Sequence, residues 1–147
     1  MQEELPGSTF VKLGRLLRTS FGAEFRALFG DEISPGDARI MAFIKQNPGT
    51  SQKEICLTFE LTKSTGSEMI ASLINNGFVE VRTNPQDKRG KELFLTPKGV
   101  EMEGKAKKAL IEHDKRLFAE VSEEELLVVK GVYEKVTEKM KGEKDGK

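Results

Sequence analysis

The sequence predicts a mainly α-helical protein with a small β-hairpin (α+β), and three observations support this fold class. Apolar residues recur at intervals of three or four over most of the chain, which is the spacing of one helix face. Between residues 78 and 95 this spacing gives way to the alternation of apolar and polar residues that is typical of strands. Capping residues, prolines and glycines divide the chain into segments of helix length. The 147 residues are enough for one folded domain.

The first predicted helix covers residues 8–29 and is amphipathic. Its apolar stripe consists of Phe10, Leu13, Leu17, Phe21, Phe25 and Leu28. Such a stripe needs a partner surface. A second helix begins in the sequence SPGD, where Ser34 can cap the helix and Pro35 suits its first position. It ends before the sequence NPG at residues 47–49.

Two short helices come next and form a helix-turn-helix pattern. Ser51 and Glu54 have the spacing of a capping box, in which each side chain accepts a hydrogen bond from the backbone of the other residue. They open the first of the two helices. Thr62 can cap the second, and Gly77 ends it. The buried face of the second helix is predicted to hold Met69, Ile70, Leu73 and Ile74.

A β-hairpin with a long tip is predicted after Gly77. The strands are expected at residues 78–83 and 92–95, and the sequence NPQDKRGK between them gives a loop of about eight residues. Long hairpin tips tend to be functional. This tip is basic, although the chain has 24 basic and 24 acidic side chains and a net charge of zero. Any site for a polyanion must therefore be local.

Two further helices are expected toward the C-terminus. Thr96 can cap a helix that has Pro97 in its first turn and continues to about residue 120. Its length of about 36 Å is more than a small domain covers. The sequence SEEE at residues 122–125 is another capping box and starts the last helix. Residues 142–147 are predicted to be a disordered tail.

Residues 34–100 resemble the MarR family of bacterial transcriptional regulators. The similarity lies in a helix-turn-helix at TSQKEICLTFELTKSTGSEMIASLINNGFVE and a wing motif at DKRGKELFLTPKG. The resemblance implies a winged helix-turn-helix with flanking dimerisation helices. It divides the chain into an N-terminal dimerisation helix at residues 1–33, a DNA-binding region at 34–96, C-terminal dimerisation helices at 97–141 and the tail at 142–147.

The resemblance also implies a function. The chain is expected to be a cytoplasmic, sequence-specific DNA-binding transcriptional regulator, a ligand-responsive repressor that acts as a homodimer on a pseudo-palindromic operator. Its expected partners are double-stranded DNA, a second copy of the chain and a small-molecule effector, for which no binding residue is identified. The alternative is a winged-helix protein-interaction module with weak or no DNA binding, which the acidic residues Glu60 and Glu68 suggest.

Candidate DNA-binding residues follow from matching the sequence to the motifs of the family. Arg89 matches the wing arginine that enters the minor groove, and Asp87 matches the acid that positions the wing. The wing candidates for phosphate contact are Arg82, Lys88 and Lys91. The helix-turn-helix candidates are Lys63, Ser64, Ser67 and Glu68 at the start of the recognition helix, and Ser51 and Gln52 for contact with the DNA backbone.

The recognition helix departs from the pattern of the family. Glu68 stands where many members have an arginine, Gly66 replaces a β-branched residue, and Glu60 replaces the usual turn glycine. Two interpretations of Glu68 are open at this point. It either accepts a hydrogen bond from cytosine N4 or forms an ion pair with a neighbouring lysine or arginine.

The single cysteine and the single histidine do not indicate catalysis or metal binding. Cys56 is interpreted as a buried structural thiol, because a redox switch would need an exposed, activated thiolate. His113 is interpreted as a partly buried interface residue, with an effector contact as the alternative. Neither an ordinary set of zinc ligands nor a nucleophile–base pair is present. No cofactor, metal, membrane segment or enzymatic activity is therefore expected.

Overall fold

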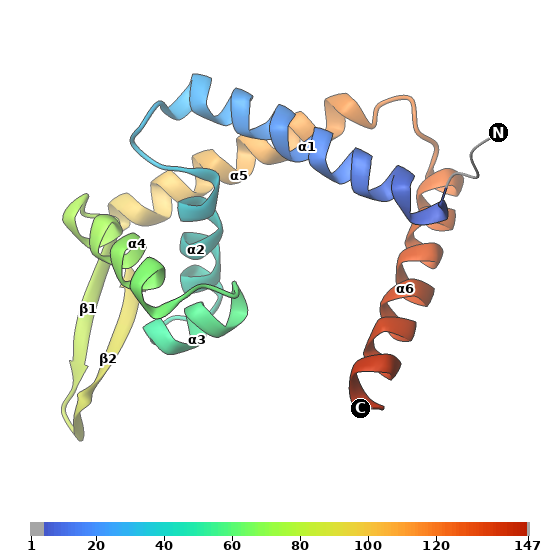
Figure 1. Cartoon of the computed structure of the whole chain (residues 1–147). Coiled ribbons are helices and arrows are strands. Elements are labelled where there is room, and N and C mark those ends of the chain that lie inside the picture. The colour runs from blue at the N-terminus through green and yellow to red at the C-terminus, as the bar shows by residue number, and fades with distance from the viewer. Residues whose placement is uncertain (1–4, 147) are drawn as a thin grey trace. The chain divides into compact units, whose positions relative to one another are not determined.

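The computed structural model describes residues 5–146, with the side chains of Lys88 and Arg89 excepted. In this part of the chain the elements follow one another as α1 (Pro6–Phe29), α2 (Pro35–Gln46), α3 (Gln52–Thr58), α4 (Lys63–Asn75), β1 (Val79–Asn84), β2 (Asp87–Leu95), α5 (Pro97–Leu117) and α6 (Glu123–Asp145) (Figure 1). The predicted fold class is thereby confirmed. The chain divides into two compact units, Met1–Leu110 and Ile111–Lys147.

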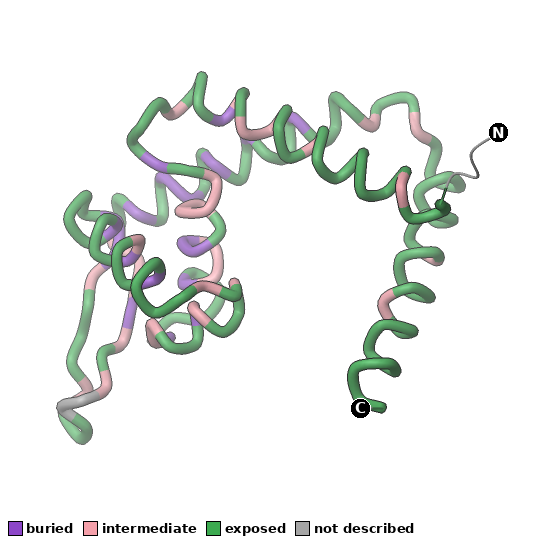
Figure 2. Tube along the Cα trace, in the orientation of Figure 1, coloured by how far each residue is buried: buried purple, intermediate pink, exposed green. Residues whose placement is uncertain are grey.

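The hydrophobic core belongs to the first unit. The buried residues come from α1 to α5 and the hairpin, as the purple segments in Figure 2 show; they are Phe25, Ile33, Ile40, Met41, Ile44, Ile55, Ile70, Leu73, Phe78, Val79, Leu93, Met102 and Ala106. Only the C-terminal part of the predicted α1 stripe reaches this core, because Phe25 is 1% exposed whereas Phe10 is 47% exposed. The N-terminal half of α1 therefore leaves its apolar side chains uncovered within a single chain.

Capping residues start the helices where the sequence predicted, with one difference. Ser34 and Ser122 each form a complete capping box with the residue three positions later. At Ser51 the box is only half formed, because Ser51 Oγ accepts from the backbone N–H of Glu54, but the Glu54 carboxylate accepts instead from Thr50 Oγ1 at 2.6 Å. The prediction of a box at this position was wrong because the neighbouring hydroxyl competes for the carboxylate.

The tip of the hairpin is shorter than predicted. β1 and β2 pair antiparallel from Val79 opposite Leu95 to Asn84 opposite Asp87, so only residues 85 and 86 form the closing turn. The expected loop of about eight residues is therefore wrong. Asn84 Oδ1 accepts from the backbone N–H of Gln86 at 2.9 Å, and such a local side-chain contact favours a tight turn. Residues 88–90 have no opposite residue in β1 and form a bulge in β2.

The base of the hairpin is anchored to the segment that precedes α3. Gly49 N donates to the carbonyl of Leu93, and Leu93 N donates to the carbonyl of Thr50, both at 2.9 Å. This isolated antiparallel bridge lies beside β2 and holds it to the start of the helix-turn-helix. The tip has no such support from this segment, because the bridge involves only residues near the end of β2.

The second unit consists of the end of α5 and the whole of α6. α5 ends at Leu117, three residues before the expected end, and α6 continues through Asp145, so residues 142–145 are helical rather than part of a disordered tail. No residue of α6 is buried. Its exposed apolar side chains are Leu126, Leu127, Val128, Val129, Val132, Tyr133, Val136 and Met140. Among the helices of residues 5–146, none is long and apolar enough to cross a membrane.

Candidate nucleic-acid interface

α3 and α4 form the helix-turn-helix that the sequence predicts. Between them Glu60 adopts a left-handed conformation with φ of 53°, which costs a residue with a side chain about 1–2 kcal/mol relative to glycine. The turn closes when Leu61 N donates to the carbonyl of Cys56 at 2.9 Å. Thr62 Oγ1 then accepts from Thr65 N at 3.1 Å and caps α4. The turn geometry is therefore achieved without the usual glycine.

α4 buries one face and exposes the other. Gly66, Ile70 and Leu73 are buried, while Met69 is half-buried and Ile74 is 36% exposed, so the predicted buried face is narrower than expected. All the predicted DNA-binding residues of this helix are exposed, namely Lys63, Ser64, Ser67 and Glu68. The helix thus presents these side chains to any partner on that side.

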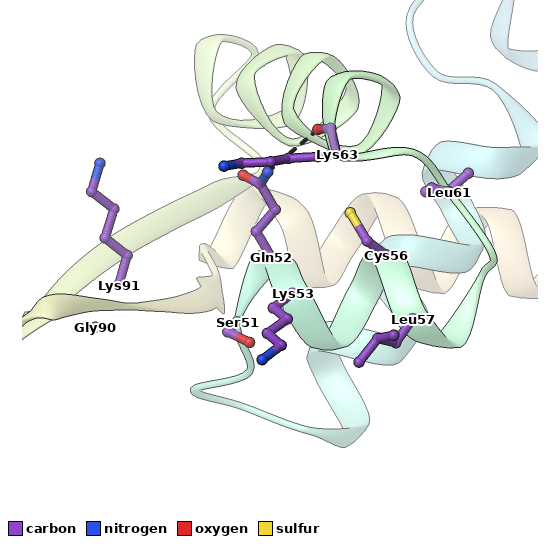
Figure 3. A pocket seen from close by; sticks show the side chains of 9 residues that line it. All are labelled: Ser51, Gln52, Lys53, Cys56, Leu57, Leu61, Lys63, Gly90 and Lys91. Atoms are coloured by element: carbon purple, nitrogen blue, oxygen red, sulfur yellow. Dashed lines mark hydrogen bonds between the residues drawn. The ribbon is translucent and has the colours of Figure 1, made fainter.

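A groove of about 820 Å³ lies between α3, the start of α4 and the hairpin (Figure 3). Its lining consists of Ser51, Gln52, Lys53, Cys56, Leu57, Leu61, Lys63, Gly90 and Lys91. Four of these were predicted as DNA contacts: Ser51, Gln52, Lys63 and Lys91. The nine lining residues include three lysines and no acid, so the groove has a positive charge although the whole chain is neutral. Figure 3 shows Gln52 between the two helices, where its Nε2 donates to the carbonyl of Lys63 at 3.5 Å.

Five lining residues were not predicted as contacts: Lys53, Cys56, Leu57, Leu61 and Gly90. Lys53 and Leu57 lie four residues apart on α3, which places them on one exposed face of this helix. Leu57 is 71% exposed, whereas Phe59 packs against the core. The interval of four residues between Lys53 and Leu57 is the feature of the sequence from which their shared helix face could have been predicted.

The predicted residues of the wing lie in different surroundings from one another. Arg82 Nη2 lies 2.6 Å from Glu80 Oε1, and the guanidinium stands over the Phe94 ring at 4.1 Å from its centroid. Arg82 is thus engaged within the hairpin. Asp87 is exposed and faces Asn84 across the turn. The backbone of Lys88 and Arg89 lies in the bulge of β2, and their side chains are outside the described part of the structure.

The helix-turn-helix and the wing are similar to a known protein family. Residues 32–90, which hold α2 to α4 and most of the wing, match the model described as "MarR family". It is similar to a putative transcriptional regulatory protein for the hcr operon of Thauera aromatica, with 27% identity over 130 residues that cover 85% of this chain and 78% of that protein. The similarity of the chain is thus to transcriptional regulators.

Solved structures of the MarR family share the fold along nearly the whole chain. A crystal structure of MarR superposes with a TM-score of 0.77 at 21% identity and covers 97% of this chain and 98% of its own. The PcaV transcriptional regulator from Streptomyces coelicolor, solved in complex with its natural ligand, has a TM-score of 0.72 at 19% identity, with 93% and 98% covered. The likeness extends over the helices on both sides of the winged helix-turn-helix.

Glu68 is the one acidic residue of the recognition helix α4. None of the salt bridges that the structure describes involves Glu68, and its side chain is exposed on α4. The sequence left two interpretations of this residue open. Among the described side chains, the structure provides no ion-pair partner for Glu68.

Gly66 and Cys56 are matched in size inside the helix-turn-helix. A Cβ on Gly66 would collide with the sulfur of Cys56, whereas the Cβ of Cys56 lies 3.9 Å away at ordinary contact distance. Glycine at position 66 therefore leaves room for the side chain of Cys56. Cys56 is half-buried, and its Sγ contacts the carbonyl of Thr62 at 3.8 Å. The prediction of a buried thiol is wrong in the degree of burial, because Cys56 also lines the groove.

Replacing Gly66 by alanine is expected to lower the free energy of unfolding by about 1–3 kcal/mol, because the added methyl overpacks the contact with Cys56. In a Cys56→Ala background the same replacement should cost less than about 1 kcal/mol, since the colliding sulfur is gone. Urea unfolding of the four proteins in this cycle measures the difference. An equal penalty in both backgrounds would show that the two residues are not coupled.

A smaller hollow of about 220 Å³ lies between α1, α2 and α5. It is lined by Phe21, Pro35, Ala38, Arg39, Ala42, Gln46, Glu103, Ala106, Lys107 and Leu110. Glu103 has a side chain that is 6% exposed, and its Oε2 accepts from Lys45 Nζ at 2.9 Å. This contact connects α2 to α5.

The start of α5 is bound to the turn that follows α4. Thr96 Oγ1 accepts from Gly99 N at 3.0 Å and donates to the carbonyl of Gly77. Lys98 Nζ donates to the carbonyl of Asn76 at 2.8 Å. Three residues of the TPKG sequence thus join the end of the recognition helix to α5.

His113 was predicted to be a partly buried interface residue. The residue is 3% exposed, so its burial is deeper than predicted. Among the described residues, no group of three His, Cys, Asp or Glu side chains could hold a metal ion.

Proposed function

We propose that the chain is a sequence-specific DNA-binding repressor that acts as a homodimer on a pseudo-palindromic operator. The observation that supports this proposal best is the groove between the helix-turn-helix and the wing, with its three lysines and no acid among the nine lining residues. A phosphate backbone is attracted to such a local positive surface even when the protein is neutral overall. Because its partner is chromosomal DNA, the protein is expected in the cytoplasm.

In this proposal α4 enters the major groove with its exposed face toward the base edges. Lys53, Lys63 and Lys91 contact phosphates along the groove, and Ser51 and Gln52 bind the DNA backbone. Arg89 enters the minor groove from the bulge of β2, as the resemblance to the family implies. The other wing residues have separate roles in this proposal. Asp87 positions the wing, and Lys88 contacts phosphate. Arg82 stabilises the hairpin through its contacts with Glu80 and Phe94.

A second copy of the chain is the partner that the exposed apolar residues require. In the first unit, α1 exposes Phe10, Val11, Leu13 and Leu16. In the second unit, α6 exposes eight large apolar side chains and buries none. Apolar surfaces of this extent mark interfaces. A two-fold symmetric dimer covers identical surfaces on both chains and presents two recognition helices, which matches a pseudo-palindromic operator.

We further propose that a small-molecule effector releases the repressor from DNA. The support is the hollow between α1, α2 and α5, which is mostly apolar and has the polar groups of Arg39, Gln46 and Glu103 at its wall. The PcaV regulator, which shares the fold, was solved with its natural ligand. A ligand in this hollow would contact α2 and α5 together and so could shift the DNA-binding region relative to α5.

The salt dependence of DNA binding tests the proposal. If each chain neutralises about four phosphates, the dimer should show a slope of about −7 in a plot of log K against log salt concentration. Lys63→Gln and Lys91→Gln should each weaken binding and reduce the magnitude of this slope by about 2, because each removes one contact per chain. Fluorescence anisotropy with the DNA upstream of the gene, across a salt series, measures both.

Lys105→Gln is the matched control for these variants. Lys105 lies on α5, where it pairs with Glu101 and does not line the groove, so its replacement removes the same charge without affecting the slope. A wild-type slope near zero would contradict DNA binding and favour the alternative of a protein-interaction module.

A further inference from the structure

Glu68 lies near the middle of the exposed face of α4. It precedes the buried Ile70 by two residues, which corresponds to a rotation of about 200° around the helix axis. Ser64, Glu68, Ala71 and Asn75 follow one another at intervals of four, three and four residues and are all exposed. This row runs along the side of α4 that faces away from the core.

The row contains one charged residue, and this residue is an acid. In the proposed complex the carboxylate of Glu68 faces DNA, where phosphates repel it and bound water is displaced. A carboxylate in such a place needs a hydrogen-bond donor. The described side chains provide no ion pair for Glu68, so the donor has to come from the DNA.

The major groove offers two kinds of donor, the N4 amino group of cytosine and the N6 amino group of adenine. Adenine presents the N7 acceptor beside its amino group, and this acceptor repels a carboxylate. Cytosine presents only a donor on its own edge, so an acid is better matched to cytosine. The neighbouring Ser64 and Ser67 carry hydroxyls that donate or accept, and they impose no opposing preference.

We infer that Glu68 determines a cytosine at one position in each half of the operator by accepting a hydrogen bond from its N4 amino group. The inference rests on the proposed DNA binding and adds to it the base that the acidic residue selects. It also explains how a recognition helix with an acid in the centre of its exposed face contributes to specific binding, since the unfavourable charge is compensated only at the correct sequence.

Selection of DNA from a randomised library by the full-length protein, followed by sequencing, tests the inference. The wild type should prefer cytosine at one position per half-site by about tenfold or more. Glu68→Gln should shift that preference to adenine, because a glutamine amide matches both N6 and N7. Glu68→Ala should abolish the preference at that position only and leave the other positions unchanged.

Glu60→Gln is the matched control. It removes one negative charge from the same helix-turn-helix, but Glu60 lies in the turn between α3 and α4 and not on the exposed row of α4. Its base preferences should equal those of the wild type. If Glu68→Gln raises the affinity for all sequences equally and keeps the wild-type preferences, Glu68 acts only through its charge and the inference is wrong. A wild type that binds no DNA at low salt would overturn the proposed function and the inference together.

Discussion

Replacing Gly99 by alanine is expected to lower the free energy of unfolding by about 3 kcal/mol or more, although alanine normally favours a helix. Gly99 is buried in the first turn of α5, and a Cβ at this position would overlap the backbone carbonyl of Phe78. This backbone cannot move at low cost, because Phe78 is 0% exposed and its carbonyl accepts from Thr96 N at 3.0 Å. Urea unfolding followed by circular dichroism measures the change.

Gly104→Ala provides the control in the same helix. Gly104 is exposed, and a Cβ there meets nothing within 4 Å, so alanine should raise the free energy of unfolding by about 0.5–1 kcal/mol. The two replacements are chemically identical and are expected to have opposite signs. If both stabilise the protein, α5 does not approach Phe78 as closely as described.

Replacement of Lys45 and replacement of Glu103, which form an ion pair, are expected to lower the free energy of unfolding by unequal amounts. Lys45→Met should lower the free energy of unfolding by about 3 kcal/mol, because it leaves a buried carboxylate without its charged partner. Glu103→Gln should cost only about 1 kcal/mol, because the side chain of Lys45 is 46% exposed and its ammonium can turn to water. Thermal and urea unfolding at neutral pH measure both variants.

The double variant Lys45→Met/Glu103→Gln completes this cycle. It should recover most of the loss caused by Lys45→Met, since no unpaired buried charge remains. Equal effects of the two single replacements, or additive effects in the double variant, would show that burial of the Glu103 carboxylate is not the cause.

Features that depend on a few neighbouring residues were predictable from the sequence. The starts of α2, α4 and α6 depend on Ser34, Thr62 and Ser122, whose side chains accept from a backbone N–H three residues later. Since all the partners lie within one helical turn, the sequence contains the whole interaction. The half-formed box at Ser51 shows the limit of this reasoning, because the competing hydroxyl of Thr50 lies outside the motif.

Features that depend on register or on tertiary contacts were not predictable in the same way. The sequence DKRGK lacks alternating apolar residues, so it was interpreted as loop, whereas backbone pairing extends β2 to Asp87. The contact of Arg82 with Phe94 requires the strand register, although its contact with Glu80 could have been inferred, because residues two apart share a face of a strand. The size match between Cys56 and Gly66 needs the packing of α3 against α4.

The bridge at the base of the hairpin fixes the spacing between the two walls of the groove through backbone atoms. Because Gly49 and Thr50 pair through their backbones with Leu93, one wall of the groove is joined to the other without any side chain taking part. The separation between Ser51 on α3 and Lys91 on the hairpin is therefore a property of the main chain. Substitutions at the tip can therefore alter the proposed contacts of the wing with DNA, while the spacing between the two walls of the groove is maintained.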